Sequence, residues 1–234
     1  MDMAALTEEI VTQENVPQAA TSDSKRERAK ANTRRKLLNS ALQLYSREGA
    51  QGLSMNKVAK GAGIAQPSFY NHFDSLEALQ VELCAELKYS YLSPMRSAWI
   101  ALLKDFDSLT DELLEQKCQQ GLMMIFTSAF ENIELFQHLI EDRPRFSEQR
   151  NRGLGGLINQ LHDEWVDIFS QGLLLSGRTF SSADANLLVD MYAAQVHELI
   201  LGCHEKRYSR EQAILILSRS FKALFINVFA NKTE

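Results

Sequence analysis

The hydrophobic positions along this chain recur with the period of an α-helix. In residues 33–47, apolar side chains fall at positions i, i+3, i+4 and i+7, which is the stripe of an amphipathic helix, and these are Leu38, Ala41, Leu42 and Tyr45. Gly49 is placed to end this helix. We find no run that alternates apolar and polar residues as a half-buried strand does. The pattern therefore predicts an all-α protein.

Residues 54–72 predict two short helices joined by a tight turn. The first spans about 54–60, with Ser54 as its N-cap, and the second spans about 65–72. The turn carries two glycines, and three apolar residues should pack the two helices together: Val58, Ala59 and Ile64. Such a pair is a helix-turn-helix, whose second helix enters the major groove of DNA with its N-terminal residues at the base edges.

Longer helices are predicted in the rest of the chain. The sequence Asp-Ser-Leu-Glu at 74–77 predicts a helix capped by Asp74 that extends to about Leu103, and Pro94 should kink or split it. Similar starts are predicted at Ser108, Ser181 and Ser209. The expected helices lie near 109–131, 133–142, 148–175, 183–203 and 210–230.

The last two of these helices are the most apolar. In 210–230, apolar side chains cover most of the circumference, so this helix must be covered on two sides. One side can face its own core and the other can face a second subunit; the alternative is a buried central helix in a monomer. The pattern favours a homodimer formed by 183–203 and 210–230.

Charge is unevenly distributed, although the net charge is only −5. Residues 1–23 hold five acids and no base, residues 24–73 hold ten bases and two acids, and residues 74–234 hold 15 bases and 23 acids. A fifty-residue segment of charge +8 favours phosphate binding, whereas a solvated helix face is the ordinary alternative. We predict a disordered acidic tail (1–23), a three-helix helix-turn-helix DNA-binding domain (24–74) and a larger helical ligand-binding and dimerisation domain (75–234).

Composition and motifs also exclude several classes of protein. Three distant cysteines argue against a disulfide framework or a metal knuckle and indicate a reducing compartment. No stretch approaches the roughly 20 apolar residues of a membrane helix, and the first twenty residues lack the pattern of a signal peptide. We expect a soluble, cytoplasmic protein that associates with the nucleoid and not with a membrane. No enzyme motif is present, so we expect no catalytic residue, metal or cofactor.

The order of residues in 61–73 carries a family resemblance. The sequence reads Gly-x-Gly-Ile, then five residues, then Tyr-x-His-Phe, followed by the capped acidic helix start. This order resembles the tetracycline-repressor (TetR) family of bacterial regulators over about residues 30–80. Within that family, the segment IAQPSFYNHF is similar to repressors of fatty-acid synthesis and desaturation genes. The resemblance implies a repressor that binds a double-stranded DNA operator and responds to a small molecule.

The resemblance also implies roles for single residues. Tyr70 and His72 fall where the family contacts DNA phosphates, Arg34 falls near the DNA backbone, and Gln66 lies where bases are read. Gln66 can bond to adenine, or it can merely point to solvent. The full set of expected DNA contacts is Arg34, Lys57, Gln66, Pro67, Ser68, Tyr70, Asn71 and His72.

Two residues depart from the family pattern. Ala65 stands where the family usually has a capping Ser or Thr, and Leu76 stands where it often has a Lys that touches phosphate. One phosphate contact is therefore in doubt. The surplus bases at 25–36 can offset it as a flexible basic arm.

The acidic large domain is expected to hold a cavity for a small hydrophobic effector. Adaptable or aromatic side chains on its helices are the candidate lining, with an ordinary core as the alternative: Met123, Phe126, Phe130, Trp165, Phe169 and Met191. If the effector is a long-chain acyl-CoA, its phosphates need bases. The one Arg-rich cluster is Arg143, Arg145, Arg150 and Arg152, which can instead be an exposed loop or pair with nearby acids.

The predicted mechanism is a homodimer whose two helix-turn-helix units bind a near-palindromic operator, with half-sites roughly 34 Å apart. Effector binding would tilt the helix that starts at Ser75 and change the separation of the two units. Two alternatives remain open: a xenobiotic-responsive regulator of an efflux pump, and a DNA-binding protein whose large domain binds a protein partner.

Overall fold

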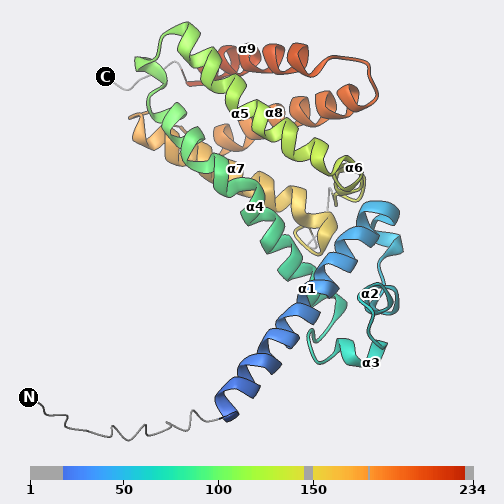
Figure 1. Cartoon of the computed structure of the whole chain (residues 1–234). Helices are drawn as coiled ribbons and strands as arrows, with labels where there is room; N and C mark the ends of the chain where they lie inside the picture. Colours follow the sequence, from blue (N-terminus) through green and yellow to red (C-terminus); the bar gives the residue numbers. More distant parts are fainter. Residues whose placement is uncertain (1–17, 145–149, 179, 230–234) are drawn as a thin grey trace, which may run out of the picture.

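The computed structural model describes residues 18–144, 150–178 and 180–229, and Figure 1 shows them as helices joined by short turns. No strand occurs in these residues, so the all-α prediction is confirmed. The elements in chain order are α1 (Gln18–Gly52), α2 (Met55–Gly61), α3 (Gln66–Phe69), α4 (Leu76–Lys104), the 3-10 turn η1 (Phe106–Ser108), α5 (Asp111–Glu131), α6 (Ile133–Glu141), the 3-10 turn η2 (Leu154–Gly156), α7 (Leu157–Leu175), α8 (Ser182–His204) and α9 (Arg210–Phe229).

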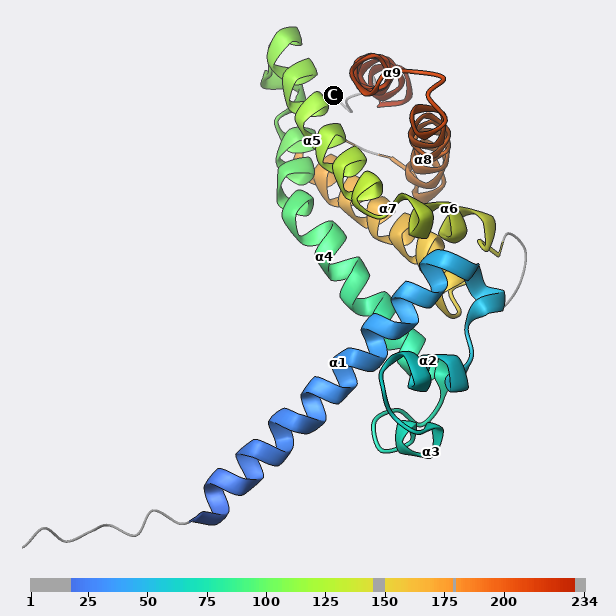
Figure 2. The ribbon, with the colours of Figure 1, turned by 45° about the vertical axis from the view of Figure 1, so that its right-hand side comes forward.

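The helices form two adjoining hydrophobic cores. The first joins α1, α2 and α3 to the start of α4, to α6 and to η2, and the second joins the rest of α4 to α5, α7, α8 and α9. Figures 1 and 2 show the short helices at one end of the molecule and α8 and α9 at the other, with α4 running between them. The helix-turn-helix thus shares its core with elements of the large domain.

The helix α1 is longer than its apolar stripe predicts. It begins at Gln18, so the last six residues of the predicted disordered tail are helical, while residues 1–17 lie outside the described residues. At the other end, Gly49 has φ +64°, a left-handed conformation that favours glycine. The predicted stop at Gly49 is therefore confirmed as a break, after which one further turn reaches Gly52.

Three of the predicted helix caps are confirmed. Ser54 accepts a hydrogen bond from the amide of Lys57, and Ser181 forms a full capping box with Asp184. Ser209 caps α9 by accepting from the amide of Gln212 at 3.1 Å.

Other boundaries differ from the prediction. The hydroxyl of Ser75, not Asp74, caps α4 by accepting from the amide of Ala78 at 3.0 Å, and Thr110, not Ser108, caps α5. The helix α4 continues through Pro94 without being split. The predicted helix 148–175 begins only at 157, after η2, and residues 148–149 lie outside the described residues.

No helix in the described part of the chain is long and apolar enough to cross a membrane.

Candidate DNA-binding surface and effector cavity

Close packing between α1 and α2 positions the helix-turn-helix. The hydroxyl of Ser40 in α1 donates a hydrogen bond to the carbonyl oxygen of Val58 at 2.9 Å, and both side chains are buried. A Cβ atom on Gly61 would collide with the Ser40 hydroxyl, so only glycine fits at this approach. In the turn that follows, Gly63 has φ +73°. These contacts determine the direction in which α3 leaves the turn.

The four-residue helix α3 divides into a buried face and an exposed face. Phe69 is completely buried and packs against Phe73, with 5.8 Å between ring centroids. The next side chain, Tyr70, is 55% exposed, as expected for neighbours about 100° apart on a helix. Gln66, Pro67 and Asn71 are also exposed, whereas Ser68 and His72 are half-buried. The exposed face of α3 and the residues directly after it therefore carry four of the eight residues expected to contact DNA.

Arg34 joins three elements of the first core. Its guanidinium lies 3.9 Å from the centroid of the Phe73 ring, donates a hydrogen bond to the carbonyl oxygen of His72 and forms a salt bridge with Glu82. The Nε–Oε1 distance of this pair is 2.8 Å. Arg34 therefore holds the segment after α3 against α1 and α4, in addition to the DNA contact expected for it.

The pKa of His72 lies below its ordinary value because the ring is partly buried and the positive charges of Lys30 and Arg34 are near. A neutral imidazole can still donate one hydrogen bond to a phosphate oxygen. Lys57 is exposed and forms a 2.7 Å salt bridge with Glu48. Leu76 packs against the first core.

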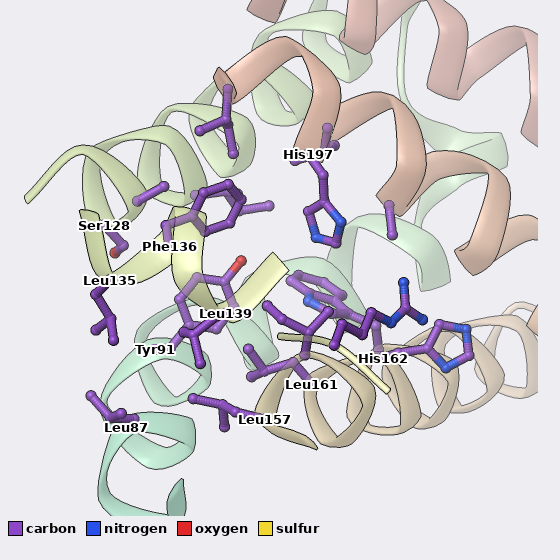
Figure 3. A pocket seen from close by; sticks show the side chains of 18 of the residues that line it. Leu87, Tyr91, Ser128, Leu135, Phe136, Leu139, Leu157, Leu161, His162 and His197 are labelled. Atoms are coloured by element: carbon purple, nitrogen blue, oxygen red, sulfur yellow. The ribbon is translucent and has the colours of Figure 1, made fainter. Parts of the chain in front are cut away.

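A cavity of about 300 Å³ lies among α4, α5, α6, α7 and α8. Most of its lining is aliphatic or aromatic, and Figure 3 shows side chains from several helices converging on it. Of the residues expected from sequence, Arg143, Trp165 and Phe169 line the cavity. The sequence did not predict the contributions of α4 and α6, which include Leu87, Tyr91, Leu135, Phe136 and Leu139.

Four residues of the predicted lining do not line this cavity. Met123 and Met191 are 47% and 41% exposed, and Phe126 is buried in the second core. Phe130 packs against the guanidinium of Arg210, 3.6 Å from its ring centroid. The residues of α5 that do face the cavity include Ile125, Ser128 and Ala129, which lie on another face of the helix.

The cavity lining also includes side chains that contain nitrogen. Arg143, His162 and His197 are among the lining residues, and the Nε of Arg143 donates to the side-chain oxygen of Asn159 at 2.6 Å. Burial and the positive charges of Arg143 and His162 lower the pKa of His197 to about 4. In Figure 3, His197 projects from α8 toward the middle of the lining, and its ring lies 5.7 Å from that of Phe136.

Two other arginines of the predicted cluster contact acids. Arg150 pairs with Asp163 at 3.1 Å, and Arg152 forms a two-bond salt bridge with Glu77 near the start of α4. Arg145 lies outside the described residues. The cluster is therefore divided, because Arg143 faces the cavity while Arg150 and Arg152 serve as structural ion pairs.

The cavity wall is connected to the helix-turn-helix through α6. The amide of Ala50, at the end of α1, donates to a carboxylate oxygen of Asp142 at 2.9 Å. Asp142 immediately follows α6 and precedes Arg143 of the cavity lining. Movement of α6 is thereby linked to α1.

Comparisons with known proteins agree with this architecture. Residues 37–83 match the family described as bacterial regulatory proteins, tetR family. The HTH-type transcriptional repressor KstR2 of Mycobacterium tuberculosis is 31% identical over 153 residues, which cover 61% of this chain and 68% of the relative. An HTH-type transcriptional regulator of Bacillus subtilis, YobS, is 25% identical over 93 residues, which cover 40% of this chain and 41% of the relative.

Solved structures share the fold. A TetR family transcription regulator from Marinobacter aquaeolei aligns over 85% of this chain and 97% of its own, with a TM-score of 0.57 and 14% identity. The fatty acid degradation regulator FadR of Bacillus halodurans aligns over 83% and 94%, with a TM-score of 0.55 and 19% identity.

The fold and the exposed α3 define a helix-turn-helix transcriptional regulator with a larger helical C-terminal domain. The matched family and the Mycobacterium relative identify it more closely. The chain belongs to the TetR family of bacterial regulatory proteins, and its function is transcriptional repression through DNA binding.

Proposed function

We propose that the chain is a homodimeric repressor that binds a palindromic operator and is controlled by an apolar acid in its cavity, with a long-chain fatty acid or acyl-CoA as the candidate effector. The observation that carries this proposal is the cavity itself, whose lining is mostly apolar and includes the guanidinium-bearing side chain of Arg143. Residues 24–74 act in it as the DNA-binding domain and 75–234 as the ligand-binding and dimerisation domain.

The exposed face of α3 supports the proposed division of DNA contacts. Gln66 and Pro67 stand at its N-terminus, where major-groove recognition places base contacts. Tyr70, Asn71 and His72 follow and would bind the phosphates beside those bases. Arg34 contributes by holding the His72 segment in place.

Exposed apolar side chains on α8 and α9 support the homodimer. Leu187 and Met191 lie one helical turn apart on α8 and are 56% and 41% exposed, and Ile216 on α9 is 59% exposed. When a second copy of the chain covers this surface, its apolar side chains are removed from water, which favours association. The proposed interface is therefore 183–203 with 210–230.

The chemistry of the cavity supports an elongated apolar ligand with one acidic group. An acyl chain would lie along Leu87, Tyr91 and Leu161, and its carboxylate or thioester oxygen would meet Arg143. Because Arg150 and Arg152 pair with acids, the phosphates of a coenzyme would have to bind elsewhere. The free acid is thus the simpler ligand.

The proposed coupling runs through two routes. The lining of α4 connects the cavity to the start of that helix, and the bond from Ala50 to Asp142 connects the end of α6 to α1. A ligand that shifts either helix would change the angle at which α3 meets DNA. A coupling of about 1 to 3 kcal/mol per ligand is sufficient for regulation.

Fluorescence anisotropy on labelled DNA from upstream of the protein's own gene tests the proposal. We expect tight binding that changes when palmitate, oleate or the corresponding acyl-CoA is added. The variant Ala193→Trp, which fills the cavity, should bind the same DNA without responding, while Ala98→Trp on the exposed face of α4 should respond normally.

The other outcomes separate the alternatives. Binding that responds only to planar aromatic drugs would replace the acyl effector with a xenobiotic one. Binding that responds to neither, with no difference between Ala193→Trp and the parent, would refute an effector cavity. Absence of binding to any upstream DNA would contradict the operator.

A further inference from the structure

The N-terminal part of α1 projects beyond the body of the molecule. Figure 2 shows this part extending past α2 and α3 as a single straight continuation of the helix. Every side chain from Ser24 to Asn32 is exposed. Ten residues of helix, 24–33, extend about 15 Å. The basic segment is thus an ordered helix instead of the flexible arm expected from sequence.

This projecting helix is strongly basic. Lys25, Arg26, Arg28 and Lys30 lie within six residues, and Glu27 is the one acid among them. None of these four bases pairs with a carboxylate in the part of the chain that the structure describes. Four exposed cations with a single acid among them attract a polyanion.

One face of the helix points the same way as the helix-turn-helix core. Arg26, Lys30 and Arg34 are spaced four residues apart, and the next residue in this series is the buried Leu38. Residues four apart share a helix face, so the apolar stripe that packs on α2 and α3 continues as a basic stripe toward the N-terminus.

The hydrogen bond from Arg34 to the carbonyl oxygen of His72, together with the electrostatics of His72, places this stripe beside the proposed DNA surface. The positive charge of Lys30, together with burial and the charge of Arg34, lowers the pKa of His72, which follows α3 directly. Lys30 is therefore near the segment that carries the proposed phosphate contacts. The stripe is continuous with that surface.

We propose that Arg26 and Lys30 form a second DNA contact, in which the projecting part of α1 binds backbone phosphates next to those bound by Tyr70 and His72. This inference rests on the proposed operator binding and extends it. From Arg26 to Arg34 the helix rises about 12 Å, enough to follow several successive phosphates. Since the helix is already formed, binding orders side chains but not backbone.

The salt dependence of DNA binding tests this contact. The variant Arg26→Gln/Lys30→Gln removes both charges, and glutamine preserves the helix. Affinity is measured against salt concentration on a 40-base-pair duplex from the upstream region and on a scrambled duplex. In a plot of log affinity against log salt, the magnitude of the slope should decrease by roughly 0.9 per lost phosphate contact, or about 1.8 per subunit. The reduction should be equal on both duplexes, because phosphates carry no sequence information.

Two matched controls isolate the stripe. Lys104→Gln/Lys117→Gln removes the same charge from exposed positions on α4 and α5 and should leave the slope unchanged. Lys25→Gln/Arg28→Gln removes two charges from the opposite face of the same helix and should reduce the slope less. Far-UV circular dichroism confirms that all variants keep their helix.

Each of the other possible results would overturn one claim: the second DNA contact, its location on one face of α1, or operator binding itself. A slope unchanged in Arg26→Gln/Lys30→Gln, with normal operator binding by the parent, overturns the second contact alone. Equal losses from both faces of α1 overturn the specific stripe in favour of diffuse attraction. A parent protein that binds neither duplex overturns the proposed operator binding, and this contact with it.

Discussion

At the scale of the residue, Gln66 and Tyr70 have different proposed partners on the DNA. The variant Gln66→Ala should weaken binding to the operator by about 1 to 3 kcal/mol and leave binding to random DNA nearly unchanged, because a base contact carries sequence information. Tyr70→Phe should weaken both, because it removes a hydroxyl from a phosphate. Anisotropy titrations on both DNAs measure the difference. Equal losses for Gln66→Ala would show that this side chain does not contact bases.

His197 makes stability depend on pH. Its pKa is about 4 in the folded protein and near 6.5 in the unfolded chain, so between these values the unfolded chain binds the extra proton. The contribution to stability is therefore complete above pH 6.5 and is lost as the pH falls toward 4. Between pH 7 and pH 5 it amounts to about 2 kcal/mol. Urea unfolding at both pH values should show a smaller drop for His197→Gln than for the parent.

The exposed His204 provides the control for this measurement. His204→Gln should lose as much stability on acidification as the parent does. If His197→Gln and His204→Gln behave alike, the low pKa assigned to His197 is incorrect.

At the scale of the element, α3 begins without a side-chain cap. Ala65 already has the extended backbone of an N-cap, with φ −70° and ψ 144°, but offers no acceptor. Ala65→Ser would supply one for the amide of Ser68, and should raise the free energy of unfolding by about 1 kcal/mol. Thermal unfolding measures this, with Ala98→Ser in the middle of α4 as a variant that should gain nothing. A loss of stability at 65 would mean that the added hydroxyl does not reach that amide.

Short sequence patterns predicted the helices and their caps better than they predicted which residues line the cavity. Ser54 and Ser181 cap the predicted helices because capping depends on a few adjacent residues. Asp74 failed because Ser75 stands beside it, and packing of α4 decides which of the two becomes the cap. The chemistry of the cavity lining was anticipated, but Met123 faces solvent because the orientation of a helix is a tertiary property. No local pattern brings Tyr91 of α4 toward His197 of α8.

At the scale of the whole molecule, the outer surface of α8 and α9 forms the proposed dimer interface. Leu187→Glu/Ile216→Glu should produce a monomer, since two carboxylates would be buried in the proposed interface. Size-exclusion chromatography with light scattering measures the mass. The monomer should also bind a palindromic operator more weakly, because each half-site is then bound independently.

A matched variant tests whether any exposed leucine has this effect. Leu174 is 68% exposed at the end of α7, outside the proposed interface, and Leu174→Glu should remain dimeric. A dimer that survives Leu187→Glu/Ile216→Glu would place the interface elsewhere.

The length of α4 has a mechanical consequence. Trp99, near its far end, lines the cavity, and Leu76, at its start, packs in the core shared with the helix-turn-helix. These residues are separated by about 35 Å of helix, so a tilt of about 5° at the cavity displaces the other end by about 3 Å. That displacement is close to the rise of one base pair. In the proposed regulation, α4 would therefore act as a lever, and a small tilt at the effector cavity would displace the helix-turn-helix by about the rise of one base pair.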